Sequence, residues 1–204
     1  MFTIGILASG KGSNLAAIIN QVKSGFLKVK IGAVISDNPG AFALEIARAN
    51  GIDAKYIEPG GYRTILEPQQ EEKYVKCLKE YDVELICLAG FMRILKKTFF
   101  NSFRGKIINI HPSLLPSFPG LEAWKQAIDY GAKFSGCTVH FVDQGIDTGP
   151  VILQAVVPVM DDDTPETLHQ RIQEKEHIIY PLAIKLISEQ KIRIEGRRVI
   201  IDEN

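Results

Sequence analysis

The sequence predicts an α/β protein with a Rossmann-like, open, mostly parallel twisted sheet, helices on both faces and an antiparallel portion in the C-terminal half. Two observations predict it. In the first half, short strands that are apolar throughout alternate with helical patterns, as in parallel sheets covered on both faces. In the second half, two strand patterns are joined by a loop that is too short for a crossover helix, so we expect them to pair antiparallel.

The first half contains five expected strands and three expected helices. The strands are Thr3–Leu7, Val29–Ser36, Ala54–Ile57, Glu84–Ala89 and Lys106–Ile110. The helices are Ser13–Lys23, Ala41–Asn50 and Gln69–Glu80. In the first helix, Leu15, Ile18, Ile19 and Val22 recur at helical spacing on one face. Gly51 closes the second helix as a C-terminal glycine.

The second half begins with the antiparallel pair, Cys137–Val142 and Val151–Val157. A long helix is expected from Pro165 to about Ser188, followed by a small hairpin over 192–201 around Gly196. There is no internal repeat or linker, and 204 residues fit one domain. We therefore expect a single domain over residues 1–204.

Composition excludes several classes of protein. Hydrophobic residues make up 46% of the chain, and Lys+Arg and Asp+Glu both number 24, so nucleic acid is not expected as a general partner. The three cysteines are odd in number and far apart, which fits a reducing compartment and no disulfide framework. Neither a signal peptide nor an apolar run of about 18 residues is present. We expect a cytoplasmic protein without a membrane segment.

Two stretches imitate metal sites. Cys137 and His140 have zinc-like spacing but no second pair, and His140 also fits a buried core histidine. The run Asp161–Asp163 is explained equally well by a helix cap, with Pro165 in the first turn. We expect no metal.

The loop after the first strand reads Gly10-Lys11-Gly12-Ser13-Asn14. It matches neither the nucleotide P-loop, which needs Ser or Thr directly after the lysine, nor the dinucleotide fingerprint, whose third glycine is missing. Backbone N–H groups at a helix N-terminus still favour an anion, so the loop predicts a phosphate site. The alternative is a tight turn in which Ser13 caps the helix.

Three further segments follow expected strands, where ligands of open parallel sheets bind. Asn109 and His111 lie two residues apart at the end of the fifth strand, so both side chains face one side and can direct donors at one developing oxyanion. Asp143 and Asp147 follow the sixth strand, where either carboxylate could pair with His111 and hold it protonated. The rigid loop Ser113-Leu114-Leu115-Pro116 favours a functional role for Asn109 and His111 over a loop cap, whereas ordinary turn chemistry is the favoured reading of each aspartate taken singly.

The third segment, Phe91–Leu95, follows the fourth strand. An apolar pentapeptide at this place would normally be core. It could also wall a slot for a flat aromatic ligand.

Taken together, the motifs Gly12-Ser13-Asn14-Leu15, Leu88 to Leu95, Asn109 to Pro116 and Asp143-x-x-x-Asp147-x-Gly149-Pro150 resemble the folate-dependent formyltransferases. The similarity runs from the first strand through Glu176-His177. The stretch Asn-Ile-His-Pro-Ser-Leu-Leu-Pro is specific for the superfamily, and Gly-Ser-Asn-Leu narrows it to the glycinamide ribonucleotide branch or the formyltetrahydrofolate hydrolases. The resemblance implies the formyltransferase fold.

The resemblance also implies a reaction. A formyl group would pass from 10-formyltetrahydrofolate, the co-substrate, to the amine of glycinamide ribonucleotide by direct attack, in purine biosynthesis. Asn109 and His111 would hold the oxyanion, assisted by Asp147. The residues implied to bind glycinamide ribonucleotide are Gly12, Ser13, Asn14, Gln173, Glu174, Lys175 and Glu176. Those implied to bind the folate are Arg63, Met92, Arg93, Ile94, Leu95, Asn109, Asp143, Gln144, Gly145, Ile146 and Asp147.

The same resemblance divides the expected single domain into three parts. Residues 1–110 would be the phosphate-binding Rossmann-like half, 111–190 the folate and catalytic half, and 191–204 the C-terminal hairpin. The family usually has a basic residue before the helix that precedes the fourth strand, and Arg63 is our candidate for it.

Other functions stay open at this point. The hydrolases carry an extra N-terminal regulatory domain and methionyl-tRNA formyltransferases an extra C-terminal one, and we expect neither here. The alternatives are a formyltetrahydrofolate hydrolase, a sugar-amine formyltransferase and, from another class, a non-catalytic phosphate-binding regulatory module. Phe99 and Phe100 fit either a homodimer face or the core, which leaves a homodimer open.

Overall fold

A computed structural model describes residues 1–202 of the chain. The chain forms two compact units, Met1–Asn109 and Ile110–Asn204. β5 (Ile107–His111) crosses the boundary between them. The unit boundaries do not test the expectation of a single domain, which stays a prediction.

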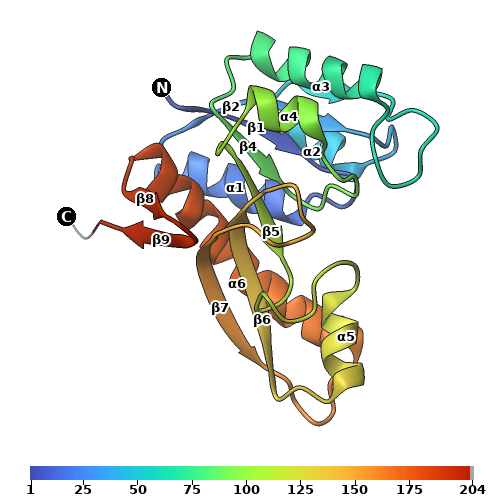
Figure 1. The fold of residues 1–204 in the computed structure, drawn as a ribbon, viewed down its shortest axis with the longest axis vertical. Coiled ribbons are helices and arrows are strands. Elements are labelled where there is room, and N and C mark those ends of the chain that lie inside the picture. Colours follow the sequence, from blue (N-terminus) through green and yellow to red (C-terminus); the bar gives the residue numbers. More distant parts are fainter. Residues whose placement is uncertain (203–204) are drawn as a thin grey trace. The chain divides into compact units, whose positions relative to one another are not determined.

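The first unit is built on parallel strands (Figure 1) in the order β3-β2-β1-β4-β5. Besides β5, they are β1 (Thr3–Leu7), β2 (Lys30–Ser36), β3 (Ala54–Tyr56) and β4 (Leu85–Leu88). Every residue of β1 and β4 is buried, which explains why these strands are apolar throughout. β1 lies between β2 and β4, so the strand order reverses there and the loops after β1 and β4 flank the switch point.

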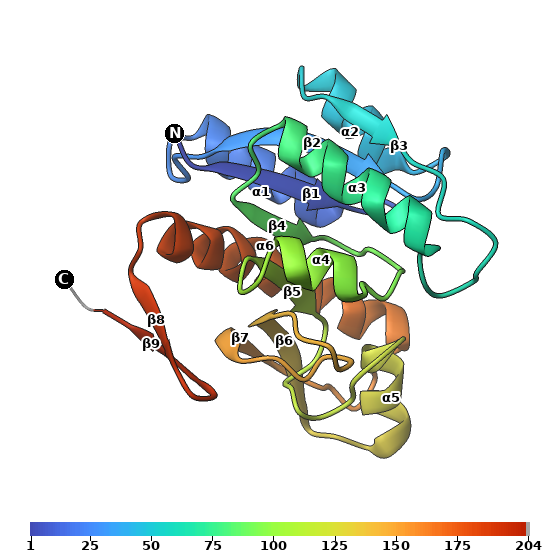
Figure 2. The ribbon, with the colours of Figure 1, turned by 45° about the horizontal axis from the view of Figure 1, so that its top comes forward.

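Helices cover both faces of this parallel sheet (Figure 2). On one face lie α1 (Ser13–Lys23) and α2 (Phe42–Ala49), and on the other lie α3 (Pro68–Glu80) and α4 (Lys97–Ser102). Gly5 explains how closely α3 approaches β1, because a Cβ at this position would come within 2.5 Å of Leu78. The sheet and helices of this unit therefore match the predicted class.

The second unit contains α5 (Ala123–Tyr130), β6 (Phe134–Phe141), β7 (Val151–Pro158), α6 (Pro165–Ser188), β8 (Ile192–Glu195) and β9 (Arg198–Ile201). β6 and β7 pair antiparallel, as do β8 and β9. α6 packs against both β6 and β7. α5 joins α6 through a stack of Trp124 on His169, whose ring centroids are 3.7 Å apart. The antiparallel portion in the C-terminal half is thereby confirmed.

Each strand and helix expected from the sequence is present, with ends that differ by up to three residues. The largest difference is β6, which begins at Phe134, ahead of the expected Cys137. Two helices, α4 and α5, were not predicted. Phe99, left open between a dimer face and the core, is fully buried in the first unit. Within residues 1–202, no helix is long and apolar enough to cross a membrane.

Candidate functional site

The loop after β1 turns sharply into α1. Gly12 occupies the N-cap position in the left-handed region, with φ 74°, and a Cβ there would lie 2.9 Å from the Cα of Ala43. Both facts require glycine. Ser13 is the first helical residue, and no side chain caps this helix, so the alternative reading of Ser13 as a cap is wrong. Gly12 has no side chain that could satisfy the N–H groups of the first turn.

Behind this loop lies a polar cluster that sequence reasoning missed, which we call the loop anchor and define as Ser9, Asp37 and Arg93. Ser9 Oγ donates to Asp37 Oδ1 at 2.5 Å and accepts from the backbone N–H of Met92 at 2.9 Å. Arg93 Nε pairs with Asp37 Oδ2 at 2.6 Å. The anchor therefore joins the loops that follow β1, β2 and β4.

Arg93 also holds a fourth segment. Its Nη1 donates to the carbonyl oxygens of Tyr62 and Arg63, each at 2.6 Å, and Ile94 N donates to Thr64 O at 2.9 Å. The structure thus brings together Arg63 and the predicted folate residues of the first unit. The Arg93 guanidinium therefore joins this segment to the loop anchor. In the same segment Met92 is exposed, whereas Leu95 is buried.

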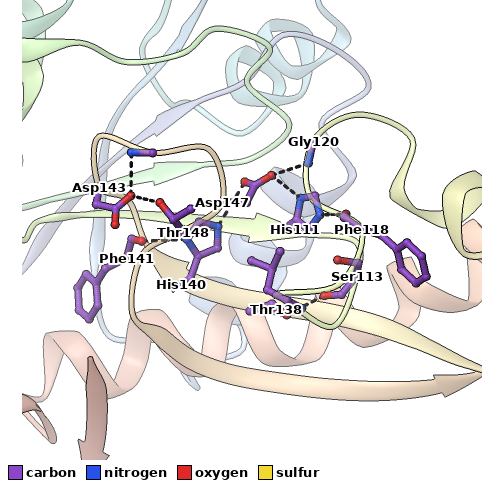
Figure 3. A network of polar contacts seen from close by, with 12 residues as sticks. His111, Ser113, Phe118, Gly120, Thr138, His140, Phe141, Asp143, Asp147 and Thr148 are labelled. Carbon is purple, nitrogen blue, oxygen red and sulfur yellow. Dashed lines mark hydrogen bonds and ion pairs between the residues drawn. The ribbon is translucent and has the colours of Figure 1, made fainter. Parts of the chain in front are cut away.

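The second unit holds a network of polar contacts around His111 (Figure 3). His111 is 4% exposed. Its Nδ1 lies 3.4 Å from Asp147 Oδ2, and its Nε2 lies 2.9 Å from the carbonyl oxygen of Phe118. A carbonyl can only accept, so Nε2 carries a proton and donates it there. Nδ1 is then the ring nitrogen that gains or loses a proton, facing a carboxylate.

Asp147 is the centre of this network. Its Oδ2 also accepts from Gly120 N at 2.8 Å, and its Oδ1 lies 3.7 Å from His140 Nε2. Burial opposes ionisation of Asp147, but the hydrogen bond from His140, the charge of His111 and the Gly120 N–H together lower its pKa below the ordinary value. Asp147 is therefore a carboxylate near neutral pH.

One expectation about His111 is wrong in this state of the chain. We expected a neighbouring carboxylate to hold His111 protonated. Burial instead lowers the pKa of His111 below its ordinary 6.5, although Asp147 and the hydrogen bond to Phe118 act in the opposite direction. His111 is therefore neutral near pH 7, with Nδ1 ready to accept a proton beside Asp147.

His140 belongs to the same network. It is 2% exposed, and its Nδ1 contacts the carbonyl oxygen of Phe141 at 2.8 Å. A carbonyl can only accept, so Nδ1 carries a proton, and Nε2 faces Asp147 and donates to it when the ring carries both protons. The sequence left His140 between a core histidine and a zinc ligand, and its side chain instead completes the surroundings of Asp147.

The loop between β6 and β7 carries Asp147 in a strained conformation, with φ 54°. Asp143 organises this loop from within, because its Oδ1 accepts from Gly145 N at 3.0 Å and Thr148 Oγ1 at 2.6 Å. Its side chain thus has the turn role that the sequence left open. Ile146 and Gln144 are exposed. Arg197, from the turn between β8 and β9, donates to the Thr148 carbonyl at 2.8 Å, so this loop also contacts the C-terminal hairpin.

The remaining predicted residues lie on single elements. Asn109 is half-buried in β5, in the same strand as His111. Gln173, Glu174, Lys175 and Glu176 form one turn of α6, in which Glu176 is 4% exposed and Glu174 and Lys175 are exposed.

The acidic run before α6 is a helix cap. Thr164 and Thr167 form a capping box with Pro165 in the first turn, and Asp163 pairs with Arg171 at 2.8 Å. Across residues 1–202, no cluster of three or more His, Cys, Asp or Glu side chains could hold a metal ion. Cys137 is buried, and burial raises the pKa of its thiol to about 12.

Comparison with known proteins gives this arrangement a family. The model of the formyl transferase family matches residues 3–184. The chain is 43% identical to a phosphoribosylglycinamide formyltransferase of Bacillus subtilis, over 88% of this chain and 91% of that protein. It is also 43% identical to the trifunctional purine biosynthetic protein adenosine-3 of Chironomus tentans, but it spans only 14% of that protein's length.

Solved structures agree with the sequence relatives. Glycinamide ribonucleotide transformylase 1 from Symbiobacterium toebii is 47% identical, with a TM-score of 0.95 over 100% of this chain and 95% of that one. A formyltetrahydrofolate deformylase from Pseudomonas syringae shares the fold at 23% identity, with a TM-score of 0.92 over 99% of this chain and 66% of that one. On these matches, the chain belongs to the formyl transferase family.

Proposed function

We propose that the chain is a phosphoribosylglycinamide formyltransferase, which moves the formyl group of 10-formyltetrahydrofolate to the amine of phosphoribosylglycinamide in de novo purine biosynthesis. The observation that carries the proposal is the centre of His111, Asp147 and His140, in a chain that matches enzymes of this name over nearly their whole length. A phosphate-binding regulatory module would leave this buried carboxylate between two histidines without a function.

In the reaction that we propose, the amine nitrogen attacks the formyl carbon and its C=O becomes an oxyanion. Asn109 and His111 stabilise this oxyanion by hydrogen bonding. The Nε2–H of His111 donates to Phe118 O in the free chain, so we propose that the substrate oxygen replaces this carbonyl as acceptor.

The amine must lose a proton after the attack. Asp147, ionised and within reach of both imidazoles, accepts it directly or through water and stabilises the charge that His111 gains. Collapse of the intermediate breaks the bond to the folate nitrogen, which takes up a proton and leaves as tetrahydrofolate. No enzyme nucleophile and no metal takes part.

We propose that each substrate group has its own set of residues. Gly12, Ser13 and Asn14 bind the substrate phosphate through the start of α1, and Gln173 to Glu176 contact the ribonucleotide. Arg63, Met92 to Leu95 and Asp143 to Asp147 form the folate site. We also propose that the enzyme acts in the cytoplasm and that the chain can form a homodimer.

The experiment is a steady-state assay with 10-formyltetrahydrofolate and three acceptor conditions: phosphoribosylglycinamide, an amino-sugar nucleotide and no acceptor. We expect turnover only with phosphoribosylglycinamide. Formate release without acceptor would instead identify a hydrolase, and turnover of the sugar would identify a sugar-amine formyltransferase.

A further inference from the structure

The loop that follows β5 is held by two side chains from the antiparallel pair β6 and β7. Thr138 Oγ1 donates to the carbonyl oxygen of Ser113 at 2.6 Å and accepts from Leu115 N at 3.0 Å. Gln154 Nε2 donates to Leu115 O at 2.9 Å and to Thr138 Oγ1 at 3.0 Å. We call Thr138 and Gln154 the loop clamp. The proposed mechanism uses neither of them.

The buried part of the loop clamp is the Thr138 hydroxyl. Thr138 is 0% exposed, and its hydroxyl makes the one donation and two acceptances that a hydroxyl allows. Both N–H bonds of Gln154 Nε2 are used as well. The two residues lie directly opposite each other in the β6–β7 register. The Thr138 hydroxyl is buried and has no spare donor, so it holds its geometry narrowly because any shift leaves a polar group unpaired, whereas Gln154 is exposed.

The clamped loop leads to the acceptor that orients His111. Ser113 Oγ donates to Ser117 O at 2.5 Å, and Ser117 N donates to Leu114 O at 3.0 Å. The next residue, Phe118, has a φ of 53°, and its carbonyl accepts from His111 Nε2. The chain from Ser113 to Phe118 is therefore closed by its own hydrogen bonds. Displacing it at Leu115 moves the carbonyl that fixes the His111 tautomer.

We propose that Thr138 and Gln154 are positioning residues of formyl transfer, which act on His111 through residues 113–118 and touch no substrate. This inference rests on the proposed function. A misplacement of a catalytic group by about 1 Å can cost about 100-fold in rate, so a clamp remote from the substrate can matter for turnover.

The test uses Thr138→Val, which removes the hydroxyl at nearly constant volume, and Thr138→Ser, which restores it. Ser135→Ala is the matched control. Ser135 is 1% exposed in the same strand, and its hydroxyl has no partner among the contacts of residues 1–202. We expect kcat of Thr138→Val to fall about 10- to 100-fold with both KM values within about twofold of the parent chain. Thr138→Ser and Ser135→Ala should stay near the parent kcat.

The tautomer and titration of His111 distinguish a positioning role of the loop clamp from a purely structural one. The measurement is ¹⁵N NMR of the imidazoles. We expect the His111 chemical shifts and titration midpoint to change in Thr138→Val and to stay the same in Ser135→Ala. Two titratable groups face His111, namely Asp147 and His140. Both are unchanged in the two variants. A lower melting temperature with unchanged kcat and unchanged His111 signals would overturn the proposal.

Gln154→Met provides a second variant if Thr138→Val does not fold, with the same expected fall in kcat and the same NMR readout. Unchanged kcat and unchanged His111 signals in this variant also overturn the inference. If the parent chain transfers no formyl group, the proposed function fails on its own. The His111 NMR signals of the clamp variants then test the inference. Signals that differ from those of the parent chain support it, and unchanged signals overturn it.

Discussion

At the residue scale, Asp147 links the parts of the candidate catalytic centre. Its two oxygens face His111, His140 and the Gly120 N–H, and its own backbone is held in the left-handed region. Since burial works against a charge at this position, the surrounding donors are needed to keep it ionised. The Gly120 N–H therefore stabilises the carboxylate, and each imidazole adds to this when it carries a proton toward Asp147.

Asp147→Asn tests the carboxylate directly. The amide keeps the shape but loses the charge that stabilises a protonated His111, and it cannot accept a proton. We expect kcat to fall by at least about 100-fold. The measurement is initial-rate kinetics, with Asp161→Asn as control because Asp161 makes only an exposed ion pair with Lys133. A parent-like kcat in Asp147→Asn would remove the residue from the mechanism.

His111 has a consequence for stability against pH. Its pKa in the folded chain lies below the ordinary 6.5, so the unfolded chain binds more protons as the pH falls through that value. Stability is therefore lost on going from about pH 7.5 to about pH 5.5. Over this pH interval, we expect the free energy of unfolding to fall less in His111→Gln than in the parent chain. Urea denaturation at both pH values measures it. His177, whose pKa burial also lowers, is common to both chains and cancels. Equal losses in both would contradict a neutral, buried His111.

The sequence predicted some residues of the site and missed others for physical reasons. Asn109 and His111 stand at the end of β5, and Asp147 lies in the loop after β6, where polar residues that follow an apolar run are visible. His140 sits inside a strand, where core and site histidines look alike. The loop anchor was missed because Ser9, Asp37 and Arg93 follow three different strands, and only strand order brings them together.

At the scale of elements, the start of α6 shows how a local signal is reinforced by a distant partner. Thr164 caps the helix as its sequence pattern predicts. The side chain of Asp163 is 3% exposed and accepts hydrogen bonds from Nη1 and Nη2 of Arg171, which lies further along α6. It also accepts from Met160 N. The Arg171 guanidinium holds the pKa of Asp163 well below its usual range.

Asp163→Ala is expected to lower the free energy of unfolding by about 1–3 kcal/mol, because it leaves Arg171 and Met160 N without their acceptor. Chemical denaturation measures this. Asp161→Ala is the matched control, since its pair with Lys133 is solvent-exposed and we expect no measurable change. Equal losses of unfolding free energy in Asp163→Ala and Asp161→Ala would contradict a stabilising role of the Asp163 contacts.

The two helices that the sequence missed differ in their local signals. α4 has six residues, and its N-terminal N–H groups at Lys96 and Thr98 are accepted by Glu71, a buried residue of α3. α5 begins after Glu122 in the left-handed region without a side-chain cap. α4 therefore depends on a tertiary contact, whereas α5 carries an amphipathic pattern and a C-terminal glycine, Gly131, that the prediction did not use.

At the scale of the whole molecule, the expectation of a single domain has a simple test. Trp124, the one tryptophan of the sequence, lies in the second unit and stacks on His169. Its fluorescence reports that unit, whereas far-UV circular dichroism reports the whole chain. A single domain predicts coincident urea transitions by the two probes. Separated midpoints would contradict it.

The central claim is that this fold transfers a formyl group to phosphoribosylglycinamide, and following the formyl carbon tests it most directly. The measurement is ¹³C NMR of a reaction with ¹³C-formyl-labelled 10-formyltetrahydrofolate and the acceptor. The account predicts that all the label appears in the formamide of the product, matched one to one by tetrahydrofolate, and that His111→Ala suppresses this signal. Label that appears as free formate, or that stays on the folate, would contradict it.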